Sequence, residues 1–222
     1  MRGRNGSRAH RLLFNMADVT TADQATPPVR PGVITLARHG EPALSRQIRL
    51  NAPEYGEWWA RYELGGLKDG QAPPDQLIEI AREAGVIIAS TRRRSIETAQ
   101  AVVAGRAFAT DPTFIEAPLP PPPWPLWLRM SPKRLGFFAR FWWWFFNNHG
   151  GQETRAEAEM RAGKAADLLV ELADGGQDVL VVAHGFFNWM IAAALKKRGL
   201  AKLVDEGHGY WSLKRFRRTQ AQ

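Results

Sequence analysis

A run of apolar residues that ends abruptly in charged ones constrains the fold of this chain more than any other feature. Residues 33–42 (VITLARHGEP) open with β-branched and aliphatic side chains, which are typical of a buried strand, and continue into Arg38, His39 and Gly40. In α/β sheets, ligands bind beyond the carboxyl ends of the strands. The run therefore predicts a central strand that delivers a guanidinium group and an imidazole ring to a functional edge.

The same pattern occurs twice more. Residues 86–89 predict a buried strand that leads into Ser90 and the basic run 91–94, and residues 178–183 predict another that leads into His184. Apolar residues at helical spacing predict helices over residues 73–84, 95–104, 153–173 and 186–197. This alternation is typical of a layered α/β fold with a mostly parallel sheet and helices on both faces. We expect one edge of that sheet to bring together Arg38, His39, Arg94 and His184.

Weaker patterns complete the expected domain. Residues 41–51 predict a loop on the rim of this edge, where Ser45 and Arg46 are available to a substrate. Residues 55–62 (YGEWWARY) predict a short helix whose rings serve packing rather than chemistry, namely Trp58, Trp59 and Tyr62. Residues 210–216 alternate in polarity and predict a last strand at the edge of the sheet. His208, between two glycines, is a further residue that could approach the pocket.

Residues 117–150 interrupt the alternation of strands and helices directly after Glu116. The first part, APLPPPPWP, suits neither a helix nor an inner strand and must be extended. The second part contains LGFFARFWWWFF, an aromatic segment that Arg140 interrupts and that is too short to span a bilayer. We predict that the insertion caps the functional edge and contacts a substrate through Trp124 and Trp127. The alternatives are packing of the rings on the core, attachment to a membrane surface, and binding of the proline run by another protein.

The length of 222 residues is that of one sizeable domain, which we expect to cover residues 31–222. Residues 1–30 predict a flexible extension, and Met16 is a plausible alternative start. The only apolar patch near the start, residues 12–14, is shorter than the core of a signal peptide. The chain has no cysteine, which excludes disulfides, a thiol nucleophile and thiolate metal sites and is compatible with the cytoplasm, where we expect the protein.

The net charge of +8 comes largely from the two ends of the chain and from the run Arg92 to Arg94. Such a field suits any anionic ligand, phosphate esters included, and because the excess is confined to the two ends and one short run we expect no nucleic acid as partner. A metal site needs three or four ligands, and neither His39 nor His184 has a partner at ligand spacing. We therefore expect no metal and no cofactor. The sequence gives no indication of an oligomeric state.

Two histidines with several arginines suit phosphoryl transfer to an imidazole. A neutral ring nitrogen attacks phosphorus, guanidinium groups hold the phosphoryl oxygens, and a protonated carboxyl group supplies the proton for the leaving alkoxide. A serine hydrolase of the α/β type would need a GxSxG elbow, which the chain lacks. The residue types thus favour a histidine nucleophile surrounded by groups that bind an anion.

Three ordered motifs resemble those of the histidine phosphatase superfamily, also called phosphoglycerate mutase-like, over residues 32–216. They are Arg38-His39-Gly40, the segment STRRRSIETA at residues 90–99, and Ala183-His184-Gly185. The resemblance implies a phosphorylated nucleophile at His39, a phosphate pocket of Arg38, Arg94 and His184, and Glu116 as general acid. Thr91 replaces a proline of the family pattern, and Arg92 and Arg93 compete with Arg94 for its register.

The resemblance implies a metal-independent phosphomonoester hydrolase that works through a phosphohistidine. Two alternatives stay open at the level of sequence. One is a phosphomutase of the same fold, which would need the phosphoenzyme to survive until a second hydroxyl group arrives. The other is an inactive protein that keeps the pocket and binds phosphate compounds or a membrane surface.

Overall fold

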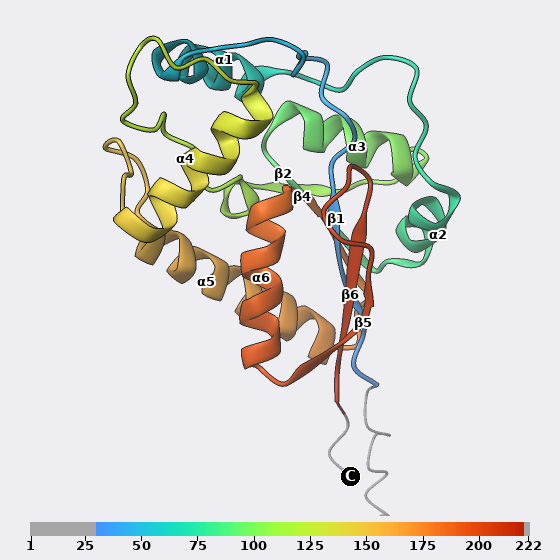
Figure 1. Ribbon diagram of the computed structural model, residues 1–222. Helices are drawn as coiled ribbons and strands as arrows, with labels where there is room; N and C mark the ends of the chain where they lie inside the picture. Colours follow the sequence, from blue (N-terminus) through green and yellow to red (C-terminus); the bar gives the residue numbers. More distant parts are fainter. Residues whose placement is uncertain (1–29, 220–222) are drawn as a thin grey trace, which may run out of the picture.

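The computed structural model describes residues 30–219, and the expected extension, apart from Arg30, lies outside this range. Its centre is a six-stranded sheet with the strand order β3-β2-β4-β1-β6-β5 (Figure 1). The strands are β1 (Ile34–Arg38), β2 (Val86–Ser90), β3 (Ala109–Asp111), β4 (Val179–Ala183), β5 (Leu200–Asp205) and β6 (Leu213–Arg218). Strands β1 to β4 pair in parallel, whereas β6 is antiparallel to both β1 and β5. The predicted fold class, an α/β fold with a mostly parallel sheet, is confirmed.

Helices cover both faces of the sheet. On one face lie α5 (Arg155–Asp174) and α6 (Gly185–Lys197), and on the other lie α2 (Asp75–Glu83) and α3 (Arg93–Val103) (Figure 1). The alternation of side chains along each strand divides the core accordingly. In β4, Val179, Val181 and Ala183 pack with α5 and α6, whereas Leu180 and Val182 pack with α2 and α3.

Two further helices lie beyond the carboxyl ends of the parallel strands. Helix α1 (Ala52–Leu64) begins with a capping box, in which the Asn51 side chain accepts a hydrogen bond from the Glu54 backbone and Glu54 reciprocates. Helix α4 (Pro132–Phe146) has a proline in its first turn, where no backbone donor is lost. The two pack against each other through a separate apolar cluster, formed by Tyr55, Trp58, Tyr62, Leu135 and Ala139. No helix in residues 30–219 combines the length and the apolar character needed to cross a bilayer.

The last strand differs from the prediction. Strand β6 lies inside the sheet, between β1 and β5, and the edge is formed by β5, which the sequence pattern did not indicate. Residues of β5 are mostly exposed or half-buried, so its sequence, LAKLVD, carries only a weak strand signal. The prediction that residues 210–216 form the edge strand is therefore wrong.

Candidate active site

The register between β1 and β4 places the two predicted histidines side by side. Arg38 of β1 is the ladder partner of Ala183 of β4, and the next residue in each chain segment is a histidine, His39 and His184. The backbone N–H of His39 also donates a 3.0 Å hydrogen bond to the carbonyl oxygen of Ala183. Both side chains are buried, and their ring centroids lie 5.2 Å apart.

Arg94 lies between the two rings. It belongs to the first turn of α3, directly after β2, and is completely buried. Its Nε atom donates to Nε2 of His39 at 3.3 Å, and its Nη2 atom lies 3.3 Å from Nδ1 of His184. Arg92 instead pairs with Glu63, and Arg93 is exposed and pairs with Glu97. Of the three arginines in the basic run, it is Arg94 that contacts the histidines.

The neighbours of each imidazole fix its tautomer. Nδ1 of His39 lies 2.7 Å from the carbonyl oxygen of Gly40, which can only accept, so this nitrogen carries the hydrogen. Nε2 of His39 faces Arg94, which can only donate, and therefore keeps its lone pair. By the same argument, His184 keeps a lone pair on Nδ1 and donates from Nε2 to the hydroxyl oxygen of Ser90 at 2.9 Å.

Burial and charge keep both rings neutral. Burial, and then the neighbouring Arg94 guanidinium, hold the pKa of His39 well below its ordinary value of 6.5. The same two causes, in the same order, lower the pKa of His184 well below 6.5. A neutral imidazole with a lone pair on Nε2 is the form of histidine that can attack an electrophile.

Glu63, near the end of α1, is a residue that the sequence analysis missed. One oxygen of its carboxylate lies 2.7 Å from Nη2 of Arg94 and the other lies 2.7 Å from Nε of Arg92. The carbonyl oxygen of Tyr62 accepts a further hydrogen bond from Arg94 at 3.1 Å. These contacts fix the plane of the buried guanidinium. The need of a buried arginine for an anionic partner was foreseeable, but nothing in the spacing pointed to Glu63.

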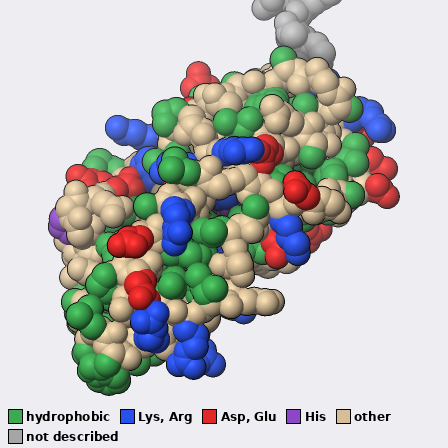
Figure 2. Space-filling model, turned by 90° about the horizontal axis from the view of Figure 1, so that it is seen from above, with side chains coloured by type: hydrophobic (Ala, Val, Ile, Leu, Met, Phe, Trp, Pro, Cys, Tyr) green, Lys and Arg blue, Asp and Glu red, His purple; other side chains and the backbone are tan. Residues whose placement is uncertain are grey.

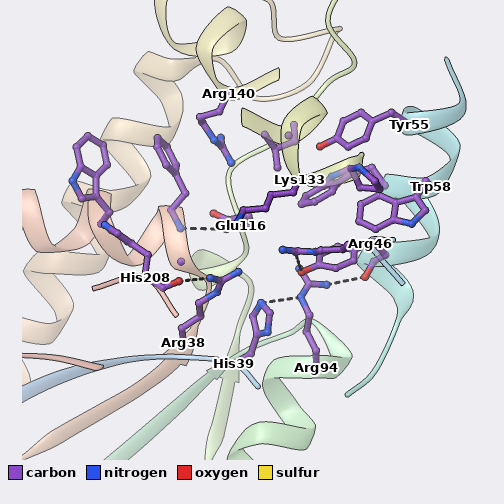
Figure 3. A pocket seen from close by; sticks show the side chains of 18 residues that line it. Arg38, His39, Arg46, Tyr55, Trp58, Arg94, Glu116, Lys133, Arg140 and His208 are labelled. Atoms are coloured by element: carbon purple, nitrogen blue, oxygen red, sulfur yellow. Dashed lines mark hydrogen bonds between the residues drawn. The ribbon is translucent and has the colours of Figure 1, made fainter. Parts of the chain in front are cut away.

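Arg38 approaches the histidines from the opposite side to Arg94 (Figure 3). Its guanidinium donates to the backbone carbonyl of His208 and lies over the ring of Tyr210, 4.5 Å from the centroid. A Cβ atom at Gly185 would lie only 3.1 Å from Nε of Arg38, so the glycine allows this close approach. Gly40 has a similar role, because any side chain there would collide with the indole ring of Trp211.

Glu116 follows the short 3-10 helix η1 (Pro112–Phe114), beyond β3, and its carboxylate reaches the start of α6. Its oxygens accept hydrogen bonds from the backbone N–H groups of Phe186 at 3.3 Å and Phe187 at 2.9 Å. Such donors at a helix amino terminus have no partner within the helix, so they anchor the carboxyl group. It lies above His39, on the wall of the cavity described below (Figure 3).

Arg38, His39, Arg94 and Glu116 line a cavity of about 430 Å³, whereas His184 lies outside this lining, behind Arg94. Its floor is cationic (Figure 3). The rings on its upper walls come from α1 and α6, whereas α4 contributes Lys133, Arg140 and two small or apolar residues. Arg46 lies on the wall and donates to the hydroxyl oxygen of Tyr62 at 2.6 Å, and Lys133 extends from α4. The apolar and aromatic lining consists of Tyr55, Trp58, Trp59, Tyr62, Leu119, Pro132, Gly136, Phe186 and Trp189.

Three residues that were predicted to contact a substrate lie outside the cavity lining. Trp127 is 78% exposed and Trp124 packs on Phe138, with ring centroids 4.8 Å apart, so neither lines the cavity. Ser45 is also outside the lining, and its hydroxyl oxygen accepts a hydrogen bond from the backbone of Gln47. Conversely, rings of α1 that were expected only to pack also face the cavity, because packing and lining give the same aromatic pattern. His208 contributes to the lining, as its position between glycines suggested.

No cluster of three histidine, aspartate or glutamate side chains within residues 30–219 could hold a metal ion. The groups that converge in the cavity are instead the guanidinium groups of Arg38 and Arg94 and the imidazole of His39, with Glu116 as the carboxyl group on its wall. Guanidinium groups arranged in this way are suited to the oxygens of a phosphoryl group. The arrangement can therefore hold a phosphate ester next to Nε2 of His39.

Residues 34–222 match the model of the histidine phosphatase superfamily, branch 1. The chain belongs to this superfamily. The match covers nearly all of the folded domain and includes both histidines and Arg94. The family resemblance drawn from the three sequence motifs is thus confirmed. No curated protein is a detectable sequence relative of this chain.

Solved structures of the same fold include phosphatases. The product of an open reading frame of Mycobacterium tuberculosis is 19% identical, with a TM-score of 0.52 over 86% of this chain and 97% of that one. A phosphoserine phosphatase variant from Entamoeba histolytica, in complex with phosphoserine, is 15% identical, with a TM-score of 0.52 over 83% of this chain and 89% of that one. At these identities the similarity shows a shared fold.

Proposed function

We propose that this histidine phosphatase hydrolyses small phosphate monoesters without a metal ion, through a phosphohistidine at His39. The observation that carries the proposal is the state of the His39 ring, which is buried and neutral and has its lone pair on Nε2 beside Arg94. Arg38 completes the cationic floor of the cavity. This combination supplies a nucleophile together with the charges that stabilise the transferring group.

In the first step, Nε2 of His39 attacks phosphorus as the bond from phosphorus to the ester oxygen breaks. Arg38 and Arg94 hold the non-bridging oxygens and balance their charge in the transition state. Glu116, in its protonated form, gives its proton to the departing alkoxide, which leaves as a neutral alcohol. The hydrogen on Nδ1 stays on the ring and keeps its hydrogen bond to the carbonyl oxygen of Gly40, whose partial negative charge stabilises the positive charge that the ring acquires.

In the second step, a water molecule attacks the phosphohistidine. The carboxylate of Glu116 accepts a proton from this water, the bond from phosphorus to nitrogen breaks, and inorganic phosphate is released. His39 recovers its lone pair and Glu116 its proton, so the cycle is closed. Glu116 is suited to both steps because its carboxyl group lies on the cavity wall and is anchored by the α6 backbone.

The cavity favours a small ester with an acidic group on its organic part. Beyond the phosphate floor, Arg46 and Lys133 extend into the walls, and neither forms an ion pair with a carboxylate of the described residues. The aromatic walls give the remaining carbon skeleton an apolar surface. Structural neighbours that hold phosphoserine and 3-phosphoglyceric acid agree with this choice, since both compounds carry a carboxylate.

A panel of phosphomonoesters, assayed by release of inorganic phosphate in the presence of a chelator, tests the proposal. The wild type should turn over at least one ester and form an acid-labile phosphoenzyme, and His39→Ala should lose both. His149→Ala is a matched control, because His149 lies outside the cavity lining. Undiminished turnover by His39→Ala would refute the assignment.

A further inference from the structure

Residues 117–152 differ in composition from the rest of the chain. They hold ten of its twenty phenylalanine and tryptophan residues and four lysine or arginine residues, but no aspartate or glutamate. Aromatic residues combined with cations, without acidic residues, are typical of segments that lie at the boundary between a lipid bilayer and water. The question is which of these rings the fold leaves exposed.

Helix α4 answers this question, because it presents an aromatic stripe to solvent. Phe137, Phe141 and Phe145 are spaced four residues apart and therefore lie along one side of the helix. Their exposed fractions are 67%, 42% and 65%. We define the α4 stripe as these three residues. Seen from above, hydrophobic side chains gather on the left of the molecule, the side where α4 lies in Figure 1 (Figure 2).

Further apolar side chains are exposed in the same insertion. Phe146, at the end of α4, is 58% exposed, and in the preceding loop Leu126 and Trp127 are 66% and 78% exposed. The rings of Phe145 and Phe146 lie 4.9 and 5.9 Å from that of Phe141, between centroids. Exposed rings that cluster in this way, rather than being scattered singly, indicate an interaction surface.

Charge indicates what this surface contacts. Lys133 and Arg134 are exposed in the first turn of α4, at the end of the stripe, and no carboxylate within residues 30–219 forms an ion pair with either. A second copy of the chain, with its own net charge of +8, would be repelled. An anionic surface is complementary, and lipid headgroups supply one that also accepts aromatic rings.

We propose that the α4 stripe docks this protein on the surface of an anionic lipid bilayer. The helix lies flat, its phenylalanines enter the boundary between headgroups and acyl chains, and Arg134 contacts lipid phosphates. The fifteen residues of α4 are too few to span the bilayer. Docking would leave the cavity-lining residues of α4 free, because none of the three stripe residues lines the cavity.

Co-sedimentation of the full chain with vesicles tests the proposal without any substrate, so its outcome is independent of the proposed hydrolysis. The vesicles are phosphatidylcholine alone and an equimolar mixture with phosphatidylserine. The wild type should bind the mixed vesicles, and high salt should weaken the binding because it screens the headgroup charge. Replacing Phe141 and Phe145 by serine should weaken binding at least about tenfold, since each ring loses its apolar burial.

A matched control replaces Leu64 and Met160 by serine, since these residues are 75% and 61% exposed elsewhere on the molecule. The control should bind as the wild type does. The control and the variant with serine at Phe141 and Phe145 should both keep the thermal midpoint of the wild type and turn over a soluble aryl phosphate normally. Arg134→Glu provides a second test that leaves every ring in place and should also weaken binding. Equal binding by the wild type, the variant with serine at Phe141 and Phe145, and Arg134→Glu, or no binding to mixed vesicles, would refute the proposal. So would dimer formation that the stripe variants abolish.

Discussion

The pairing of Glu63 with Arg94 predicts a stability defect that phosphate should correct. Removing one partner of a fully buried ion pair costs about 3–5 kcal/mol of unfolding free energy. Arg94 is buried, but the Glu63 side chain is 14% exposed, and a glutamine there keeps an oxygen that accepts from Nη2 of Arg94. For Glu63→Gln we therefore expect a smaller loss, about 2 kcal/mol. In a domain of this length the loss corresponds to a fall in Tm of about 4–8 °C.

Inorganic phosphate should reverse part of this defect. It binds beside the same guanidinium, and in the variant that guanidinium no longer shares its charge with a carboxylate. A ligand that binds only the folded state raises stability in proportion to the logarithm of its concentration over Kd. Phosphate should thus raise the Tm of Glu63→Gln by more than it raises the Tm of the wild type.

Thermal unfolding with and without phosphate measures both effects. Glu159→Gln is the control, because its partner Arg155 is on the surface and the two side chains are 48% and 40% exposed. Exposed pairs of this kind contribute less than about 1 kcal/mol, so this variant should behave as the wild type does. If phosphate raised the Tm of Glu63→Gln and of the wild type equally, Glu63 would only support the fold and the coupling through Arg94 would be refuted.

Three further outcomes follow from the site. Burial lowers the folded-state pKa of His39 and His184 below 6.5, so in acid protons bind preferentially to the unfolded chain. The unfolding free energy should therefore decrease as the pH is lowered through 6.5. By about pH 5.5 the loss should reach up to about 1.4 kcal/mol for each histidine, measured by urea unfolding, and a flat profile would contradict it. Arg94→Lys should lower kcat/KM at least about tenfold because lysine lacks the planar fork, whereas Arg93→Lys, at an exposed position, should not; equal losses would refute the register. Glu116→Gln should slow alkyl phosphates much more than an aryl phosphate, whose leaving group needs no proton, and equal slowing would exclude Glu116 as the acid.

The strand ends could be predicted from the sequence because their signal is local. Each buried run is short, apolar and followed at once by polar residues, and parallel strands necessarily end at the same edge of the sheet. His39, His184 and Arg94 therefore converge without any knowledge of the loops. Glu63 could not be found in this way, since its role depends on how α1 crosses that edge, and no local pattern encodes the path of a helix beyond the sheet.

The insertion at residues 117–150 shows a second limit of prediction from the sequence. Its composition predicted a cap, and residues of α4 do line the cavity, but none of the rings of the insertion lies in that lining. Which side chains face inward depends on the helical phase, which Ser131 and Pro132 set at the start of α4. Trp124 and Trp127 precede this start and lie in the loop, where no periodicity indicates their direction. Aromatic content alone thus predicts an apolar segment, but it does not predict which rings pack on the domain, which line the cavity and which stay exposed.

Helix α4 presents three different faces. Leu135, Ala139 and Trp143 are buried and attach the helix to the rest of the domain. Lys133, Gly136 and Arg140 face the cavity, and the α4 stripe faces solvent. The reacting groups, in contrast, directly follow strands of the sheet. Residues on the outer and cavity faces of α4 can therefore be substituted without moving His39 or Arg94. In the proposed mechanism the reacting groups are thus held by the sheet, whereas the proposed selection of the ester and the proposed contact with a bilayer depend on α1 and α4.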